Sequence, residues 1–173
     1  MEIDVCIPFN SNKNLAEAYN RALKQGTSEW VLFLDHDVFL CNPLWYTMCQ
    51  TAIEQLKSDP QVACITCMAG GETDQKGDYR PMEYHIQSAM VRYKMYGNQL
   101  EQIHEHAAGF FLLLNRRIAT EIGFIQQRKN NINKIDTDFG NRLLKAGYHI
   151  YRMPGLYVYH RRGLRKLKKK FDG

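Results

Sequence analysis

The sequence predicts an α/β fold in which helices flank a parallel-rich central sheet. Two observations support this fold class. The strand-like segments are short and almost wholly apolar, and they alternate with helix-like segments without any detectable repeat. Continuous apolar runs are typical of strands buried on both faces, as in a parallel sheet covered by helices. The alternation favours one sheet with its helices over separate helical and sheet domains.

The first half of the chain contains three expected strands and two expected helices. The strands are 3–9, Trp30–Leu34 and 62–67. Apolar residues at helical spacing from Leu15 to Leu23 predict the first helix, which should end before Gly26. Asn42 followed by Pro43 predicts the start of the second helix, because Asn is a good N-cap and Pro suits the first helical position.

The second half is expected to begin with a polar, glycine-containing loop at 69–81 and a helix at 83–96. The remaining expected elements are a strand at 110–114, a helix at 116–122 before Gly123, a polar loop at 126–134, a helix from Thr137 to Gly147, and strands at 149–153 and 156–160. These elements form one predicted domain, residues 1–160, and a basic segment, residues 161–173, follows it.

The composition is that of a folded globular domain. Of the 173 residues, 45% are hydrophobic and 24% are charged, which excludes a disordered chain. There is no basic leader before a long apolar stretch and no apolar run of membrane-spanning length, so we expect neither a signal peptide nor a transmembrane segment. Five cysteines without such a leader indicate a reducing, cytoplasmic compartment.

Positive charge is concentrated at the C-terminal end. Seven of the 23 basic residues lie between Arg161 and Lys170, whereas residues 1–160 hold 16 basic and 17 acidic residues. A terminal basic run is commonly a solvated tail, and it also suits an anionic partner. Nucleic acid, an acidic membrane surface and the phosphates of a bound nucleotide are the candidate partners.

Two aspartates, Asp35 and Asp37, follow the most apolar predicted strand, Trp30–Leu34. Carboxylates at that position cost free energy unless a cation meets them. The carboxyl ends of strands are also where open α/β sheets bind ligands. Aspartate oxygens suit Mg²⁺ or Mn²⁺, which commonly bind together with phosphates. The alternative is that one aspartate caps the turn after the strand.

Further candidate residues stand near the ends of other elements. Asp136 and Asp138 begin a predicted helix, where they could cap it and favour its dipole, or where one could act as a general base. His160 ends the last strand and is either an ordinary edge residue or a third metal ligand. His104 and His106 would share one face of a strand, but acceptor contact or simple exposure is favoured over a metal role.

Six stretches carry a recognisable combination of motifs. In chain order they are the strand ending in Pro8-Phe9-Asn10, the helix 14–23, the strand ending in Asp35-His36-Asp37, the segment 107–115, the acidic helix 136–147 and the closing strand 156–160. Together they resemble the inverting family-2 glycosyltransferases of the GT-A fold, in a compact, phage-like form, over nearly the whole chain. The resemblance implies a GT-A type, Rossmann-like sheet. It also implies a metal-dependent enzyme that moves a sugar from a nucleotide-sugar to an acceptor hydroxyl with inversion.

The resemblance implies roles for particular residues. Asp35, Asp37 and His160 would bind Mn²⁺ or Mg²⁺ at the diphosphate of the donor, which is expected to be a UDP-sugar; Asp35 also lies close to the donor. Asp136 takes the place of the catalytic base, with Asp138 as the second candidate. The other expected donor-binding residues are Pro8, Phe9, Asn10, Asn14 and Arg21 in the nucleotide pocket and Arg161 or Arg162 at the phosphates.

The sequence departs from the family pattern in two places. Family members usually have a further strand and helix, with an acidic residue that contacts the nucleobase, between the opening strand and the next helix. Here Asn10 leads almost directly into the helix 14–23. The acidic helix of the family normally begins Glu-Asp, whereas Ile135 precedes Asp136 here.

The acceptor and two other function classes stay open at this point. DNA carrying hydroxymethylated pyrimidines is a candidate acceptor, because the basic segment 161–173 could neutralise its phosphates. Anionic lipid or the donor diphosphate could instead bind to that segment. A nucleotidyltransferase would use a related sheet and a metal, but the loop 10–14 has no glycine. The third class is a non-catalytic module that binds sugar or nucleic acid on the same fold.

Overall fold

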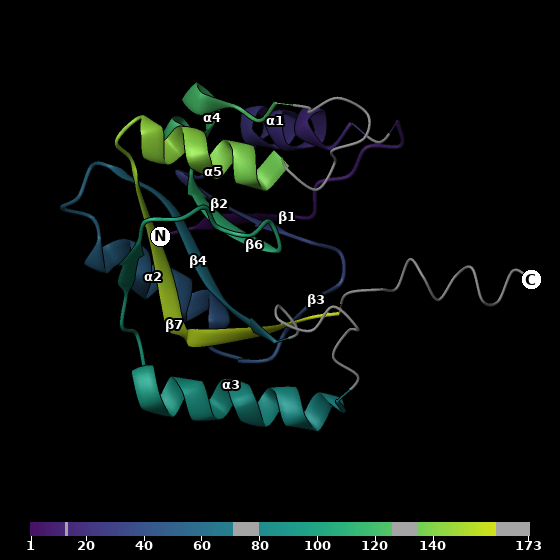
Figure 1. Cartoon of the computed structure of the whole chain (residues 1–173), viewed down its shortest axis with the longest axis vertical. Coiled ribbons are helices and arrows are strands. Elements are labelled where there is room, and N and C mark those ends of the chain that lie inside the picture. Colours follow the sequence, from purple (N-terminus) through teal and green to yellow (C-terminus); the bar gives the residue numbers. More distant parts are fainter. Residues whose placement is uncertain (13, 71–79, 126–134, 162–173) are drawn as a thin grey trace, which may run out of the picture.

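The computed structural model describes residues 1–12, 14–70, 80–125 and 135–161, and these form a curled mixed sheet with helices on both faces (Figure 1). The strands are β1 (Ile3–Cys6), β2 (Trp30–Leu34), β3 (Val38–Leu40), β4 (Val62–Gly70), β5 (Glu101–Ile103), β6 (Phe111–Asn115) and β7 (His149–His160). The helices are α1 (Leu15–Gln25), α2 (Trp45–Gln55), α3 (Met82–Tyr96), α4 (Arg116–Ile122) and α5 (Ile135–Lys145).

The strand order across the described sheet is β1-β2-β6-β4-β7-β3, and β5 pairs with β7 off this path. The pairs β1–β2 and β4–β7 are parallel, and β6 lies antiparallel between β2 and β4. Consequently β1, β2, β4 and β7 all run in one direction, while β3, β5 and β6 run in the other. The predicted α/β class, with a Rossmann-like central sheet flanked by helices, is confirmed.

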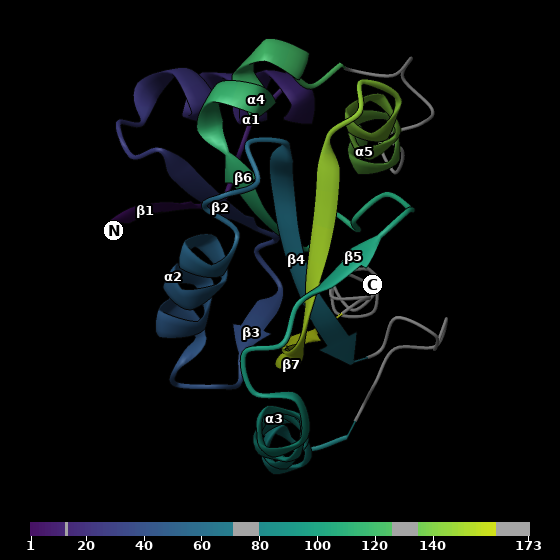
Figure 2. The ribbon, with the colours of Figure 1, turned by 90° about the vertical axis from the view of Figure 1, so that its left-hand side faces the viewer.

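The middle of the sheet is buried on both faces, as the apolar runs predicted. All five residues of β2 are buried. Val31 and Phe33 pack with α1, α4 and α5 in one hydrophobic cluster, and Leu32 and Leu34 pack with α2 in another. The two views agree with these layers, with α1, α4 and α5 together beyond one face and α2 beyond the other (Figure 2).

The first helix is confirmed, whereas the predicted start of the second is wrong. The Asn14 side chain caps α1 by accepting a hydrogen bond from the Glu17 N–H, 3.1 Å away. Asn42 instead accepts from the Leu44 N–H within a turn, and α2 begins only at Trp45. Asn side chains can hold such a turn as readily as they cap a helix.

The last two predicted strands are one strand, β7, and this expectation is corrected. The pairing with β4 shifts register where Cys67 pairs with Met153 and Met68 pairs with Tyr157, so that residues 154–156 form a bulge. A bulge accommodates Pro154 because that residue has no N–H for the ladder. The next residue is Gly155, and a Cβ there would lie 2.1 Å from the Gly97 carbonyl oxygen at the end of α3.

Several other boundaries differ from expectation. β3 and β5 were not predicted; each has three residues and adds antiparallel to the long β7. β1 ends at Cys6, and β4 continues to Gly70 into the expected loop. Most of the two predicted loops, 71–79 and 126–134, and residues 162–173 lie outside the described residues. None of the helices in the described ranges has the length and apolar character needed to cross a bilayer.

Arg116 is a structural residue that the sequence did not single out. Its side chain is largely buried and donates to the Leu23 and Ser28 carbonyl oxygens at 2.7 and 2.5 Å, and it forms an ion pair with Asp4. Burial works to raise the pKa of Asp4, but hydrogen bonds from Ser28 and the charge of Arg116 outweigh it and hold that pKa below its ordinary value. This cluster joins β1, the end of α1 and the segment that enters β2.

We expect Asp4→Asn to lower the free energy of unfolding by about 2 kcal/mol at neutral pH, because Arg116 loses its ionic partner. The folded pKa of Asp4 is depressed, so its contribution is present above the ordinary value of 3.8 and is lost as pH falls through the folded pKa. Urea unfolding at neutral and acidic pH measures both effects. Glu2→Gln, at an exposed neighbour, is the control; an Asp4 effect no larger than that control would contradict the prediction.

Candidate functional site

Three predicted metal ligands lie together at one edge of the sheet. Asp35 follows the last residue of β2, and β3 pairs with β7 so that Val38 lies opposite His160. The His160 Nε2 atom is 3.2 Å from Asp37 Oδ1 and 3.5 Å from Asp35 Oδ2. One potential ligand atom from each of the three residues lies within 4.8 Å of the others. The pairing of β3 with β7 therefore brings together residues that are far apart in the sequence.

The turn that carries the two aspartates is closed by backbone groups. The Val38 N–H donates to the Asp35 carbonyl oxygen at 3.2 Å, and the Arg161 N–H donates to the Asp37 carbonyl oxygen at 2.9 Å. Both side-chain carboxylates approach His160. The backbone bonds thus account for the turn, and the two carboxylates lie next to His160.

The donor atoms fit a divalent cation that accepts both oxygen and nitrogen ligands. Two carboxylates this close repel each other, and a cation between them removes that cost. The side chains of Asp37 and His160 are 15% and 12% exposed and that of Asp35 is 39% exposed, so the group is shielded but open on one side. Because Mg²⁺ prefers an all-oxygen octahedron, the imidazole favours a transition metal such as Mn²⁺.

Asp136 is linked to this group through two adjacent residues that immediately precede β6. The Gly109 N–H donates to Asp136 Oδ2 at 2.8 Å. The next residue, Phe110, accepts a hydrogen bond from the Asp35 N–H at 3.2 Å, and its ring centroid lies 5.5 Å from that of His160. A Cβ on Gly109 would come within 3.2 Å of the Asp136 carboxylate, so glycine allows this close approach.

The Tyr19 hydroxyl provides a second sign that the two acidic positions are close. Tyr19 is buried on α1 and was predicted only as a core residue. Burial raises the pKa of Tyr19 above its ordinary value, and the negative charges of Asp35 and Asp136 raise it further. Both carboxylates therefore act on the same side chain.

Asp138 lies in a different environment from Asp136. Its carboxylate forms an ion pair with Arg142, whose Nε is 2.8 Å from Asp138 Oδ2. The same guanidinium donates to the carbonyl oxygens of Ile122 and Gly123 at 2.6 and 2.7 Å. Asp138 thus takes part in a contact that fastens α5 to the end of α4.

Of the residues predicted for the nucleotide pocket, Pro8, Phe9 and Asn10 lie in the loop after β1, at the edge where Asp35 follows the parallel neighbour β2, whereas Arg21 lies in α1. Asn10 Oδ1 accepts from the Asn12 N–H at 2.8 Å, and Arg21 donates to the Phe9 carbonyl oxygen at 3.1 Å. Asn14 is occupied as the cap of α1. The Phe9 side chain is exposed and Pro8 is half-buried, so an aromatic ring is available at this edge.

The remaining candidate residues are two arginines after β7 and two histidines after β5. Arg161 is exposed and contacts Asp37 through its backbone, and Arg162 lies outside the described residues. His104 and His106 follow β5, which ends at Ile103, so the strand pattern expected for them is wrong. His106 packs closely on α5. A Cβ placed on Gly140 of that helix would lie 2.6 Å from the Cβ of His106. Within the described ranges, the group that could hold a metal is Asp35, Asp37 and His160.

The comparisons with known proteins agree with this architecture. The pattern of the family described as Glycosyl transferase family 2 matches residues 3–123. The fold is similar to a solved structure described as mannosyltransferase PcManGT from Pyrobaculum calidifontis in complex with GDP-Man and Mn²⁺, with a TM-score of 0.53 and 18% sequence identity. That match covers 87% of this chain and 37% of the other, so the chain spans little more than a third of its length. No curated protein sequence matches the chain at a significant level.

We expect Asp37→Asn to weaken Mn²⁺ binding by roughly 100-fold or more, because even outer contacts of a metal site are commonly worth 10- to 100-fold in affinity. Titration followed by electron paramagnetic resonance of free Mn²⁺ measures the affinity without any assay of activity. His36→Ala is the matched control, since His36 is exposed between the two aspartates. Equal affinities for wild type and Asp37→Asn would remove Asp37 from the site.

Proposed function

The chain belongs to glycosyl transferase family 2, and we propose that it transfers a sugar from a nucleotide-sugar to an acceptor hydroxyl, with a divalent metal and with inversion at the anomeric carbon. The observation that supports this most directly is the set of contacts around Gly109 and Phe110. They join a metal-binding group, formed by Asp35, Asp37 and His160, to a carboxylate, Asp136, that is suited to accept a proton.

The proposed binding site for the donor is the turn that carries Asp35 and Asp37, together with the residues around it. The structural neighbour binds GDP-Man and Mn²⁺, which supports a nucleotide-sugar and a divalent cation here. Asp35, Asp37 and His160 would hold the cation, which when bound neutralises charge on the leaving diphosphate. The exposed Arg161 stands next to His160, where a guanidinium could bind a phosphate oxygen. Phe9 and Asn10 are the candidates for contact with the nucleoside, expected from the sequence to be uridine.

Asp136 is the proposed general base for the acceptor hydroxyl. A carboxylate that accepts the proton of the attacking hydroxyl makes that oxygen a better nucleophile. Attack from the face opposite the leaving diphosphate inverts the anomeric centre, and the proton goes to the carboxylate. The Gly109 N–H fixes Asp136 Oδ2, and the Thr137 N–H lies 2.9 Å from Oδ1. Asp138 is the weaker candidate because Arg142 already binds it.

Hydroxymethylated DNA is the acceptor that the sequence suggested, and the seven basic residues between Arg161 and Lys170 support an anionic acceptor or carrier. Glycosylation of such DNA in the presence of the donor tests this acceptor directly.

A panel of nucleotide-sugars with Mn²⁺ is the test of the activity. We expect one donor to release its nucleoside diphosphate slowly without an acceptor, and chelation of the metal to stop the release. The base of that donor identifies the nucleotide, whether uridine or guanosine. Pyrophosphate release from a nucleoside triphosphate would indicate a nucleotidyltransferase instead. Donor binding without any release would indicate a non-catalytic module.

Matched substitutions two residues apart on α5 test the base. We expect Asp136→Asn to lower the transfer rate roughly 10³-fold, a typical loss for a general base, and to leave donor affinity unchanged in calorimetry. Asp138→Asn should chiefly lower the unfolding temperature, since it breaks the ion pair with Arg142. A larger rate loss in Asp138→Asn than in Asp136→Asn would reverse the assignment.

A further inference from the structure

Tyr19 is a buried phenol that has no role in the transfer as described so far. The residue is only 4% exposed, and its ring lies edge-on to Phe33 of β2 with the two ring centroids 4.9 Å apart. Within the described residues, no hydrogen bond is recorded for the Tyr19 hydroxyl, and that oxygen is not sealed from solvent. Because a buried phenol ordinarily has a partner for its O–H, this hydroxyl is available to a ligand.

A row of aromatic rings holds Tyr19 in place. Phe124 stacks on Tyr19 with ring centroids 4.4 Å apart, and Phe139 of α5 stacks on Phe124 at 4.0 Å. The neighbouring Asn20 side chain accepts from the Phe124 N–H and donates to the Phe124 carbonyl oxygen, both at 2.8 Å. The row therefore runs from β2 through α1 to α5, and a ring packed in this way keeps its hydroxyl at one position.

The Tyr19 side chain extends toward the edge of the sheet that carries the candidate site. Helix α1 begins after the loop that follows β1, at the same edge as Asp35, and Tyr19 is its fifth residue. Helical side chains lean toward the N-terminus of their helix, which here is this edge. Phe33 precedes Asp35 by two residues, and Phe139 follows Asp136 by three. The row of rings thus lies directly beneath both acids.

The charges around Tyr19 agree with this placement. Burial raises the pKa of Tyr19 above its ordinary value, and the negative charges of Asp35 and Asp136 raise it further. The phenol therefore keeps its proton at neutral pH. It is a neutral group that can both donate and accept a hydrogen bond between two carboxylates.

We propose that the Tyr19 hydroxyl binds a hydroxyl group of the sugar that is transferred, so that Tyr19 takes part in recognition of the donor. This role rests on the transferase function proposed above. In an inverting transfer, the anomeric carbon lies between the leaving diphosphate and the attacking oxygen. The diphosphate is assigned to the metal group that includes Asp35, and the attacking oxygen to Asp136. A phenol close to both carboxylates therefore faces the sugar between them.

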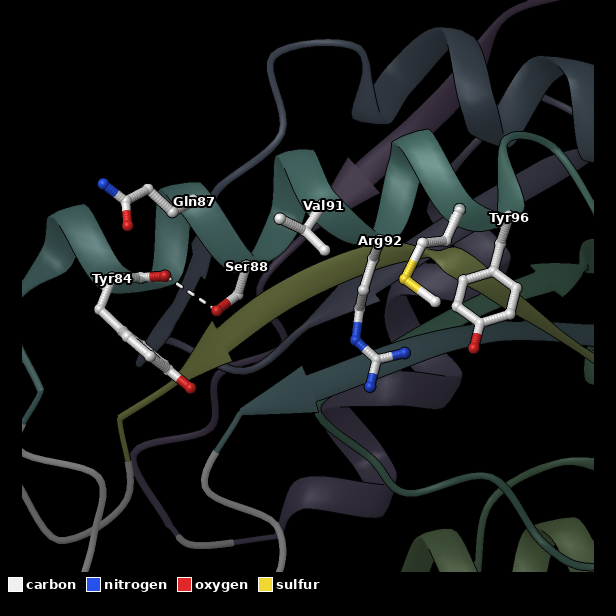
Figure 3. A pocket seen from close by; sticks show the side chains of 7 residues that line it. Tyr84, Gln87, Ser88, Val91, Arg92 and Tyr96 are labelled. Atoms are coloured by element: carbon white, nitrogen blue, oxygen red, sulfur yellow. Dashed lines mark hydrogen bonds between the residues drawn. The ribbon is translucent and has the colours of Figure 1, made fainter.

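The cavity along α3 is another place that offers phenol groups. Its volume is about 440 Å³, and Tyr84 and Tyr96 lie at its two ends (Figure 3). Among the described residues that line it, Arg92 is charged and there is no carboxylate. Without a carboxylate to bind a metal or to accept a proton, this cavity does not fit the transferred sugar.

Calorimetry with the full chain and its Tyr19→Phe variant tests this role, because phenylalanine keeps the row of rings and removes only the hydroxyl. The ligands are GDP-mannose, UDP-glucose and UDP-galactose, each compared with its nucleoside diphosphate in the presence of Mn²⁺. We expect Tyr19→Phe to weaken binding of the nucleotide-sugar that wild type accepts by roughly threefold to tenfold, the usual effect of one neutral hydrogen bond. Affinity for the corresponding diphosphate should stay unchanged, since that ligand carries no sugar.

Tyr148→Phe and Tyr84→Phe are the matched controls. The Tyr148 hydroxyl lies 3.4 Å from the Glu121 carboxylate, beside the end of β7 opposite to His160, and Tyr84 lines the α3 cavity. Neither change should alter the affinities, and thermal unfolding verifies that each variant is folded. Equal affinity of wild type and Tyr19→Phe for the nucleotide-sugar would overturn the role of Tyr19. So would an equal loss for nucleotide-sugar and diphosphate, or a loss in Tyr84→Phe instead. Wild type that binds none of the nucleotide-sugars would overturn the transferase proposal together with this role.

Discussion

Two hydrogen bonds from the backbone of adjacent residues that immediately precede β6 position both acids of the candidate site. The Gly109 N–H holds Asp136 from α5, and the Phe110 carbonyl oxygen accepts from the N–H of Asp35 after β2. Backbone groups are rigid references, because a strand that is paired on both sides cannot shift without breaking its ladder. β6 is paired in this way, between β2 and β4. The separation of the proposed base from the proposed metal group is therefore set by the central strand of the sheet.

Two partly buried arginines keep the surrounding elements in place. Arg116 joins β1 to the end of α1, and Arg142 joins α5 to the end of α4. The first contact matters because β1 is an edge strand in the described sheet. The Tyr46 hydroxyl accepts a hydrogen bond from the Ile3 N–H at 3.0 Å and covers part of that edge.

Helix α3 connects the site with the molecular surface. Its inner side packs on β7 one residue before His160, and its outer side presents apolar side chains. Because apolar residues lie on both sides of α3, its sequence has no clear helical periodicity.

The sequence by itself determined the α/β class, the buried β2, the helices α1 and α4, and the identity of the residues that form the candidate site. Those features depend on local patterns: continuous apolar runs, helical spacing, caps and carboxylates at strand ends. The structure brings His160 to Asp35 and Asp37, as the resemblance implied. Only the tertiary structure decided that Arg142 pairs with Asp138 and that β3 and β5 exist at all. A three-residue strand has too few residues for a pattern and forms because β7 offers a ladder to pair with. The choice between Asp136 and Asp138 likewise depends on contacts from Gly109 and Arg142, which only the folded chain brings within hydrogen-bonding distance of the two carboxylates.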